Sequence, residues 1–210
     1  MFDTVIKTDF IDQKTLSILR EYCDVCEYYI NRSYPGLPAE NQDNHYFTDK
    51  MLLEMGLPPV QPEILRSHSS SHMAEEIRDI FSKIYSACGE IIFEIYKKRM
   101  LLMKESGIVR YQPGQSLPYH RDWEDDDEWA RDSNRQTIHL SSVLYINDDY
   151  KGGEFKMSSQ KFGDFTNDIM LIKPPAGSIV FFDALQWHAS APVDSGNKYA
   201  STNFYTLHDI

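Results

Sequence analysis

The chain has 210 residues, 41% hydrophobic and 13% aromatic, which is enough apolar material for one sizeable core. A formal net charge of −11 leaves no basic excess to neutralise phosphates, which argues against nucleic acid or an anionic membrane as a partner. No apolar run approaches the length of a membrane span, and the N-terminus lacks the basic start of a signal peptide. We therefore expect a cytoplasmic globular protein that acts on a small or cationic substrate.

The first half of the chain is expected to be mainly helical. Apolar residues at three- and four-residue steps predict an amphipathic helix over about residues 12–31, with Asp12 as its N-cap. Residues 31–62 are rich in proline, glycine, asparagine and aspartate and predict an irregular connection. A second apolar period over residues 71–103 predicts a long helix that lies on a flat surface.

Two residue pairs in this half have spacings that metal sites also use. Cys23 and Cys26 form a C-x-x-C pair, but they lie in a helical pattern and no second pair completes a zinc site. His68 and His72 are four residues apart at a serine-rich helix entry. We interpret both pairs as structural. The odd number of cysteines also argues against a disulfide framework.

From Ser106 onward the apolar period becomes two, which is typical of strands. Antiparallel pairing is expected, because parallel strands need long crossover connections. About six to eight strands beside a helical layer predict a mainly β fold with flanking helices, a jelly roll or barrel. We expect one domain, with about residues 1–105 as helical buttress and connection and about 106–210 as the core. The β-prone runs are residues 108–111, 137–147, 153–158, 169–174, 177–184 and 199–207.

The run LPYHRDWE contains the first candidate site residues. His120 and Asp122 are two residues apart on a β-like segment, so their side chains should point to the same face. His188 lies in another β-rich stretch and is the third candidate. Two histidines and one carboxylate suit the facial metal site of non-haem Fe(II) oxygenases, which leaves open coordination positions, and zinc is the main rival.

A lysine follows the distal histidine at an informative distance. Lys198 lies ten residues beyond His188, and Pro192 and Gly196 between them predict a turn that returns the chain antiparallel beside its own start. A lysine is a point charge suited to one end of a dicarboxylate. Lys198 should share one strand face with three alternate residues, Ala200, Thr202 and Phe204.

Four motifs occur in a fixed order between about residues 108 and 206: YQPGQSLPYHRD, LYIN, KGGEF and HASAPVDSGNK. In this order and spacing the sequence resembles the Fe(II)- and 2-oxoglutarate-dependent dioxygenases, specifically their prolyl 4-hydroxylase-like branch. The resemblance covers roughly half of the chain. It implies a double-stranded β-helix that uses Fe(II), 2-oxoglutarate and O2, with ascorbate as a supporting reductant.

The resemblance also implies a role for individual residues. His120, Asp122 and His188 would hold the iron, and Lys198 would bind the far carboxylate of 2-oxoglutarate. Tyr111, Tyr145 and Phe155 would lie beside that cosubstrate, and Trp123, Trp187 and Phe204 would contact the substrate. Two residues depart from the family pattern. Phe155 replaces a frequent threonine and cannot donate a hydrogen bond, and Phe204 replaces a frequent tryptophan, which weakens the inference that proline is the substrate.

The expected reaction is hydroxylation of an unactivated C–H bond with release of succinate and CO2. Peptidyl proline, another residue in a peptide, a free amino acid and a small metabolite remain open as substrates. In halogenating relatives a small residue replaces the carboxylate, so Asp122 disfavours halogenation. An alternative from another class is a jelly-roll binding module without turnover.

Two further signals lie near the candidate site. Residues 124–128 are five consecutive acids flanked by Trp123 and Trp129, which suits either a solvated loop or a lid that attracts a cationic substrate. His139 is six residues from Tyr145, about 20 Å along a strand, which is too far for both to serve one centre. We therefore interpret His139 as structural.

Overall fold

The protein was analysed as a computed structural model, which describes residues 3–31, 46–48, 53–54, 56, 67–69, 74–123, 137–158 and 169–209. None of the helices in these ranges is long and apolar enough to cross a membrane. The regular elements in chain order are β1 (Val5–Lys7), α1 (Gln13–Val25), β2 (Tyr28–Asn31), β3 (Tyr46–Thr48), β4 (Ser67–Ser69), α3 (Glu75–Tyr96), β5 (Arg99–Tyr111), β6 (Leu117–His120), β7 (Leu140–Tyr145), β8 (Lys151–Gly152), β9 (Phe155–Ser158), β10 (Ile169–Ile172), β11 (Ile179–Asp183), β12 (His188–Ser190), β13 (Val193–Ser195) and β14 (Lys198–His208).

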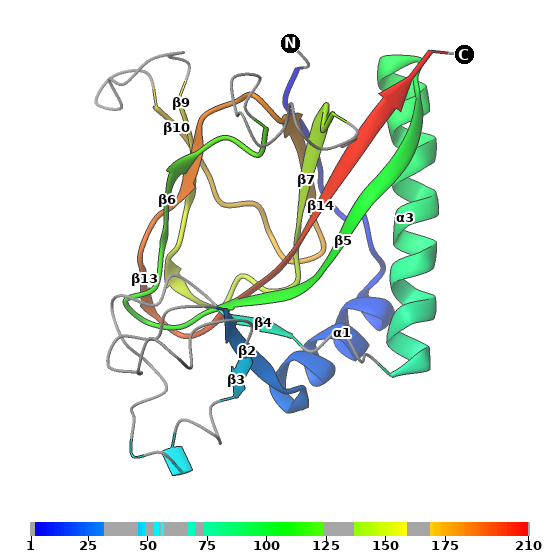
Figure 1. Ribbon diagram of the computed structural model, residues 1–210. Helices are drawn as coiled ribbons and strands as arrows, with labels where there is room; N and C mark the ends of the chain where they lie inside the picture. Colours follow the sequence, from blue (N-terminus) through cyan, green and yellow to red (C-terminus); the bar gives the residue numbers. More distant parts are fainter. Residues whose placement is uncertain are drawn as a thin grey trace.

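Two antiparallel sheets form the walls of a barrel (Figure 1). The larger sheet has the strand order β1-β11-β7-β14-β5-β4-β2-β3, and the smaller one has the order β10-β9-β12-β6. A short third sheet pairs β8 with β13. Strands distant in sequence thus lie side by side, as in β14 between β5 and β7. The predicted mainly β jelly roll is confirmed.

Helices cover the outer face of the larger sheet. α3 lies along β5 and β14 (Figure 1), and α1 begins at the predicted N-cap, where Asp12 accepts a hydrogen bond of 2.9 Å from the backbone N–H of Thr15. The buried face of α3 recurs at three- and four-residue steps, as a helix with one apolar stripe requires. This face packs in one cluster with outward-facing strand residues such as Ile108, Leu144 and Tyr205.

A second apolar cluster fills the inner face of the same sheet. Val109 on β5 and Val143 and Tyr145 on β7 belong to it, whereas their neighbours Ile108 and Leu144 belong to the outer cluster. This alternation follows the two-residue period of a strand. Every residue of β7 is buried, because the strand is covered on both faces. Residues of this inner cluster form part of the wall of the cavity described below.

The first helix ends earlier than predicted. α1 stops at Val25 because Cys26 has an extended backbone with ψ of 152°. Residues 28–31, predicted as helix, instead form β2, which pairs with β3 and β4. The sequence YYIN there is rich in aromatic and β-branched residues, which favour strands.

The second helix also ends early. α3 stops at Tyr96, where Lys97 takes a left-handed conformation with φ of 54° and donates its backbone N–H to the carbonyl of Phe93. Residues 99–103, predicted as helix, begin β5, so the core sheet starts before residue 106. Met100 fits the apolar pattern of the helix because its side chain packs on α3. Its Cε atom lies 3.1 Å from the position that a Cβ atom on Gly89 would occupy.

The connection predicted over residues 31–62 lies mostly outside the described residues. Its described part includes β3, a short strand that was not predicted. His68 lies on β4, which pairs with β2 and β5, so it does not stand at a helix entry. His72 lies outside the described residues. The expected helix entry at His68 is therefore wrong.

Candidate active site

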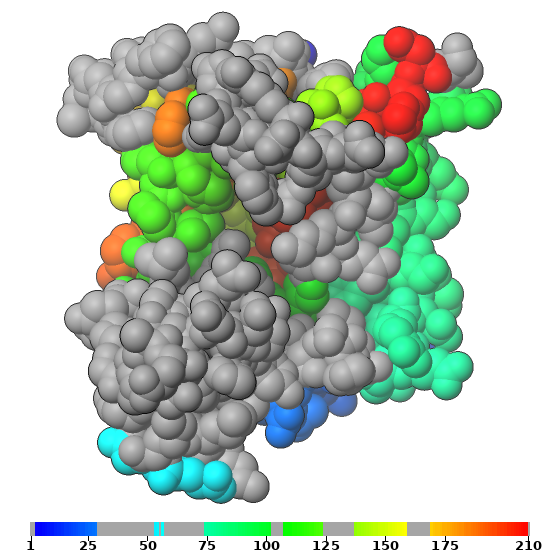
Figure 2. Space-filling model, in the orientation of Figure 1, coloured from blue at the N-terminus to red at the C-terminus, as the bar shows by residue number. Residues whose placement is uncertain are grey.

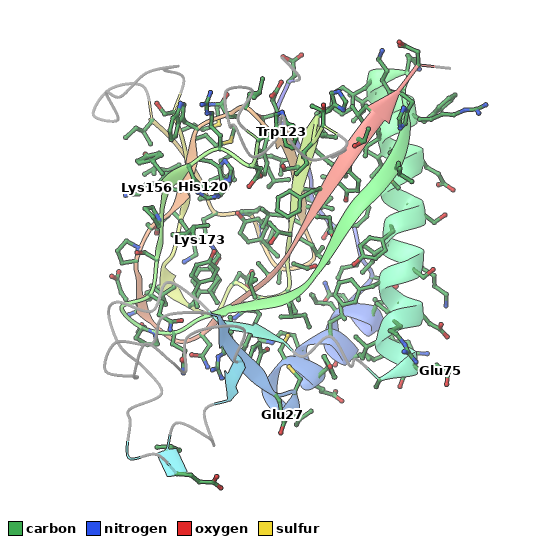
Figure 3. All side chains as sticks on the ribbon, viewed as in Figure 1. Glu27, Glu75, His120, Trp123, Lys156 and Lys173 are labelled. Atoms are coloured by element: carbon green, nitrogen blue, oxygen red, sulfur yellow. The ribbon has the colours of Figure 1, made fainter. Side chains whose placement is uncertain are left out.

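The two histidines of the candidate site are neighbours on adjacent strands of the smaller sheet. His120 ends β6 and His188 begins β12, and the two are directly paired in the antiparallel ladder. Directly paired residues point to the same face of a sheet, and here that face is the barrel interior, where Figure 3 shows His120 on the inner side of β6. The two imidazole centroids are 4.2 Å apart.

Asp122 lies next to the two histidines, in a turn that two backbone hydrogen bonds fix in place. The backbone N–H groups of Asp122 and Trp123 both donate to the carbonyl of Ala184, at 3.0 and 3.2 Å. Ala184 directly follows β11, so this contact fixes the segment after β6 against the end of the larger sheet. The Asp122 side chain, with 8% of its surface exposed, therefore lies between the two sheets.

The three side chains offer one convergent set of donor atoms. Nε2 of His120 lies 3.5 Å from Oδ1 of Asp122, and Nε2 of His188 lies 3.6 Å from Oδ2. All three ligand atoms lie within 4.8 Å of one another, and no other such group occurs among the described residues. Nitrogen, nitrogen and carboxylate oxygen on one side of a point make a facial triad.

The other ring nitrogen of each histidine is held by the backbone. Nδ1 of His120 lies 2.9 Å from the carbonyl of Pro118, and Nδ1 of His188 lies 2.8 Å from the carbonyl of Gln186. A carbonyl only accepts, so both Nδ1 atoms carry the proton and both Nε2 lone pairs face Asp122. Histidine ligands of metal ions are oriented in this way.

The carboxylate of Asp122 is buried and incompletely paired. Burial by itself raises its pKa, but His120 and His188, when they are protonated, and Ser141 together bring the pKa below its ordinary value. Its Oδ2 atom makes no hydrogen bond to any described residue. A buried, unpaired carboxylate oxygen between two oriented imidazoles fits a divalent metal ion, which would satisfy all three donors.

A cavity of about 470 Å³, including its open mouth, contains the triad. In the space-filling view the dark red surface of β14 lies at the bottom of a hollow on this face (Figure 2). The cavity wall is mostly apolar, with polar groups at the triad and around Lys198. The lining residues are Val109, Tyr111, Leu117, His120, Asp122, Val143, Phe155, His188, Ala189, Ser190, Lys198, Ala200, Thr202 and Phe204. The predicted shared face of residues 198, 200, 202 and 204 is thus confirmed.

Lys198 is a buried cation in this cavity, with 3% of its surface exposed. Its Nζ donates to the carbonyl of Gly153 at 2.8 Å and to Oγ of Ser190 at 2.9 Å. The predicted turn does not bring it there, because β14 joins the larger sheet while β12 belongs to the smaller one. Lys198 instead reaches across the barrel, and that expectation of a return beside β12 is wrong.

The other residues predicted for the cosubstrate surround Lys198 in different ways. Tyr111 lines the cavity, with its ring centroid 5.1 Å from Nζ. Tyr145 is fully buried, is not among the lining residues, and lies with its ring 5.6 Å from Nζ. Burial raises the pKa of Tyr145 well above its ordinary value. Phe155 lines the cavity and packs against His188 and Phe182 at ring distances of 5.4 and 5.1 Å.

The predicted substrate residues differ in position. Phe204 lines the cavity, whereas Trp123 and Trp187 are half-buried and are not among the lining residues. The guanidinium carbon of Arg121 lies 5.0 Å from the Trp187 ring. Contact of the two tryptophans with a substrate stays a prediction. The acidic residues 124–128 and Trp129 lie outside the described residues.

Two structural interpretations are confirmed. Nδ1 of His139 accepts a hydrogen bond of 3.1 Å from the backbone N–H of Leu207, and the backbone N–H of His139 donates to the carbonyl of Tyr205. Cys23 is buried in the helical core, and Cys26 caps the same helix. Burial raises the pKa of the Cys23 thiol to about 12, as expected for a thiol packed in a core.

Sequence reasoning missed several residues around the site. Ser190 follows His188 by two residues, so the alternation of a strand could have placed it on the same face. Ser141 near Asp122 had no sequence signal, because its position depends on which strands are neighbours. The apolar lining residues Val109, Leu117 and Val143 were not singled out from the sequence.

Solved structures with a similar fold come from several sources. The viral collagen prolyl hydroxylase of Paramecium bursaria Chlorella virus-1, in complex with 2-oxoglutarate, has a TM-score of 0.60 at 18% identity, covering 98% of this chain and 96% of that one. A prolyl 4-hydroxylase of Pseudomonas putida has a TM-score of 0.56 at 16% identity, with coverages of 96% and 91%. HygX of Streptomyces hygroscopicus, with nickel, 2-oxoglutarate and hygromycin B bound, has a TM-score of 0.59 at 8% identity, with coverages of 96% and 82%.

A match to a family model adds evidence from sequence to this similarity of fold. No curated protein matches the chain in sequence. Residues 106–206 match the model of the 2OG-Fe(II) oxygenase superfamily, and the match contains His120, Asp122, His188 and Lys198. The chain therefore matches the 2OG-Fe(II) oxygenase superfamily over residues 106–206, nearly half of its length, and it has a prolyl 4-hydroxylase-like fold. This match makes the protein a 2-oxoglutarate-dependent dioxygenase that uses Fe(II).

Proposed function

We propose that the protein hydroxylates a C–H bond of a peptide or small molecule, with Fe(II) held by His120, Asp122 and His188. The observation that carries this proposal is a single cavity with the facial triad on its wall and a buried cation, Lys198, farther in. The fit of the donors supports iron at the triad, since two imidazoles present Nε2 and the carboxylate has an unpaired oxygen. Three protein ligands leave coordination positions open.

Lys198 is the proposed partner of the remote carboxylate of 2-oxoglutarate. A buried ammonium is stabilised by an anion, and an anionic ligand in an apolar cavity needs such a partner. Tyr111 would lie beside that carboxylate. The buried ring of Tyr145 would pack against the ammonium group of Lys198. Phe155 would pack on the cosubstrate's methylene groups, because its ring can make only apolar contacts.

Iron bound at the triad would supply the oxidant by activating O2 as 2-oxoglutarate is converted to succinate and CO2, so that one oxygen atom enters the substrate and the other enters succinate. The chain's own contribution is to orient His120 and His188 through their backbone hydrogen bonds and to keep the cosubstrate in a water-poor cavity. Phe204 would form the substrate wall, beside Thr202 on β14. A halogenase is disfavoured, because the Asp122 carboxylate occupies the position where chloride would bind.

The substrate class includes peptidyl proline, other peptide residues and small molecules. The relatives in fold include prolyl hydroxylases and a protein with hygromycin B bound, so both classes are reasonable. The acidic run 124–128 supports a preference for cationic members of either class.

Succinate release and product mass test this proposal. The protein is incubated with Fe(II), 2-oxoglutarate, O2 and panels of proline-containing peptides, basic peptides, amino acids and cationic small molecules. We expect substrate-dependent succinate release and a product heavier by one oxygen. The catalytic proposal would be contradicted if the protein binds Fe(II) and 2-oxoglutarate but forms no succinate with any member of the panel, including succinate formed without hydroxylation of a substrate. The Asp122→Ala variant serves as the negative control.

A further inference from the structure

We propose that Ser190 is a second binding residue for the remote carboxylate of the dicarboxylate cosubstrate, acting together with Lys198. This inference rests on the proposed function. Ser190 ends β12, lies two residues beyond His188 and lines the same cavity, with 6% of its surface exposed. It therefore belongs to the wall between the proposed metal ligands and the buried cation.

The hydrogen bond between Lys198 and Ser190 has a defined direction. An ammonium group has donors and no acceptor, so in the 2.9 Å contact Nζ donates and Oγ of Ser190 accepts. The hydroxyl hydrogen of Ser190 is thus left for another acceptor. In the part of the chain that the structure describes, Ser190 donates no hydrogen bond, although its hydroxyl borders the cavity. A buried donor of this kind is expected to meet a ligand.

The surroundings of Ser190 offer few other polar groups for an anion. Phe155 on β9 is the directly paired neighbour of Ser190 on the adjacent strand, so the two side chains point to the same face. Phe155 presents only a ring, and the lining residues Val143, Leu117 and Ala200 are apolar, so Tyr111, whose ring centroid is 5.1 Å from Nζ, is the other polar lining residue beside Lys198. A carboxylate has two oxygens that each accept hydrogen bonds, and one ammonium cannot satisfy both in an apolar site.

The hydroxyl can serve the same anion that Lys198 attracts. Ser190 lies on the smaller sheet and Lys198 on the larger one, so the two groups approach from opposite walls of the barrel. An ammonium that donates to a hydroxyl also polarises it, which strengthens the bond that the hydroxyl donates onward. The remote carboxylate would then receive one charge-assisted bond from Nζ and one bond from the Ser190 hydroxyl.

A matched pair of ligands separates this role from a structural one. Metal-loaded protein, with Mn(II) as the probe, is titrated without O2 with 2-oxoglutarate and with 2-oxopentanoate, which has the same carbon chain without the remote carboxylate. In Ser190→Ala we expect the dissociation constant of 2-oxoglutarate to rise about tenfold, as for a lost bond to a charged group. The dissociation constant of 2-oxopentanoate should stay unchanged. Ser190→Cys, a weaker donor of similar volume, should show a smaller rise.

Controls distinguish the possible failures. Ser178→Ala removes another fully buried hydroxyl that does not line the cavity, and it should bind both ligands as the wild type does. Equal weakening of both ligands in Ser190→Ala, or no weakening of 2-oxoglutarate, would overturn the role of Ser190 while leaving the proposed function intact. Wild-type protein that binds Mn(II) but not 2-oxoglutarate would overturn the proposed function, and this inference with it.

Discussion

His120 and His188 are separated by 67 intervening residues in the chain but are directly paired across β6 and β12, with their rings 4.2 Å apart. The pairing of two strands thus creates half of the candidate metal site, and Asp122 completes it from the turn after β6. Each of the three donors comes from a segment held by backbone hydrogen bonds, so the site is formed by the fold itself.

Removal of either histidine should weaken metal binding. In His120→Ala or His188→Ala we expect the affinity for Fe(II) or Mn(II) to fall at least about 100-fold, since even groups that only orient ligands contribute 10–100-fold. Anaerobic metal titration measures this affinity. His208→Ala, an exposed residue at the end of β14, is the matched control and should bind metal as the wild type does. Near wild-type affinity in both site variants would place the metal elsewhere.

Loss of Lys198 should affect the cosubstrate and spare the metal. The lysine is buried and would form a charge-assisted contact, whose loss costs about 2–5 kcal/mol. We therefore expect the 2-oxoglutarate concentration for half-maximal turnover to rise by well over tenfold in Lys198→Ala, with Mn(II) affinity unchanged. Lys151→Ala, an exposed lysine on β8, is the control. An unchanged requirement for 2-oxoglutarate would assign the carboxylate to another residue.

Ser141 is expected to position Asp122. Its hydroxyl is fully buried, contributes to lowering the pKa of Asp122 and makes no well-formed hydrogen bond to a described residue. In Ser141→Ala the carboxylate loses a polar neighbour, so we expect Mn(II) affinity to fall about tenfold and the visible spectrum of the Co(II) form to change. Ser142→Ala is adjacent on β7, equally buried and hydrogen-bonded to Tyr205, and it should alter folding stability without altering that spectrum. Identical Co(II) spectra for wild type and Ser141→Ala would exclude the positioning role.

The ion pair between α1 and the loop after β7 should make a pH-dependent contribution to stability. Arg20 donates two hydrogen bonds to Asp149, at 2.7 and 2.9 Å, and this bond lowers the pKa of Asp149 to about 2. The stabilisation is therefore present above the ordinary pKa of 3.8 and is lost as the pH falls toward 2. Because the carboxylate is 62% exposed, Asp149→Asn should reduce the free energy of unfolding by only about 0.5–1 kcal/mol at pH 6.

Urea unfolding at pH 6, 4 and 3 tests that prediction. The difference between wild type and Asp149→Asn should shrink as the pH falls, whereas Asp194→Asn, an exposed residue on β13, should match the wild type throughout. A difference that stays constant down to pH 3 would show that Asp149 acts through hydrogen bonds that do not depend on its charge.

The acidic run after the site should matter only for a charged substrate. Glu124–Glu128 follow Asp122 by two to six residues, and their field is screened over about 8 Å at physiological ionic strength. Changing Asp125, Asp126 and Asp127 to asparagine should raise the Michaelis constant for a basic substrate at low salt and leave uncoupled 2-oxoglutarate decarboxylation unchanged. Steady-state kinetics at two salt concentrations measure both. If the Michaelis constant for the basic substrate is the same for both proteins at both salt concentrations, the preference for cationic substrates is wrong.

The site residues could be predicted from sequence because each follows a local rule. The two-residue spacing of His120 and Asp122 predicted that they converge, although Asp122 lies in the turn after β6 and not on a strand, and the spacing between His188 and Lys198 belongs to an ordered motif. These rules do not specify which strands become neighbours. The expected return of the chain beside β12 was wrong for that reason, since Lys198 reaches the cavity from the opposite sheet.

Helix ends and supporting residues were the main failures. Apolar spacing continues beyond Tyr96 because Met100 packs on α3 from a strand, so the pattern cannot separate helix from strand there. The left-handed conformation of Lys97 that ends the helix has no signal in a lysine. Ser141 becomes relevant only after β6, β7 and β11 are assembled.

A crystal structure of the protein grown without O2 with Mn(II) and 2-oxoglutarate would test the central claim most directly. We predict one metal ion bound by Nε2 of His120, Nε2 of His188 and a carboxylate oxygen of Asp122, at about 2.0–2.3 Å. The remote carboxylate of 2-oxoglutarate should contact Nζ of Lys198. A metal ion bound elsewhere, or 2-oxoglutarate bound with its remote carboxylate away from Lys198, would contradict the account.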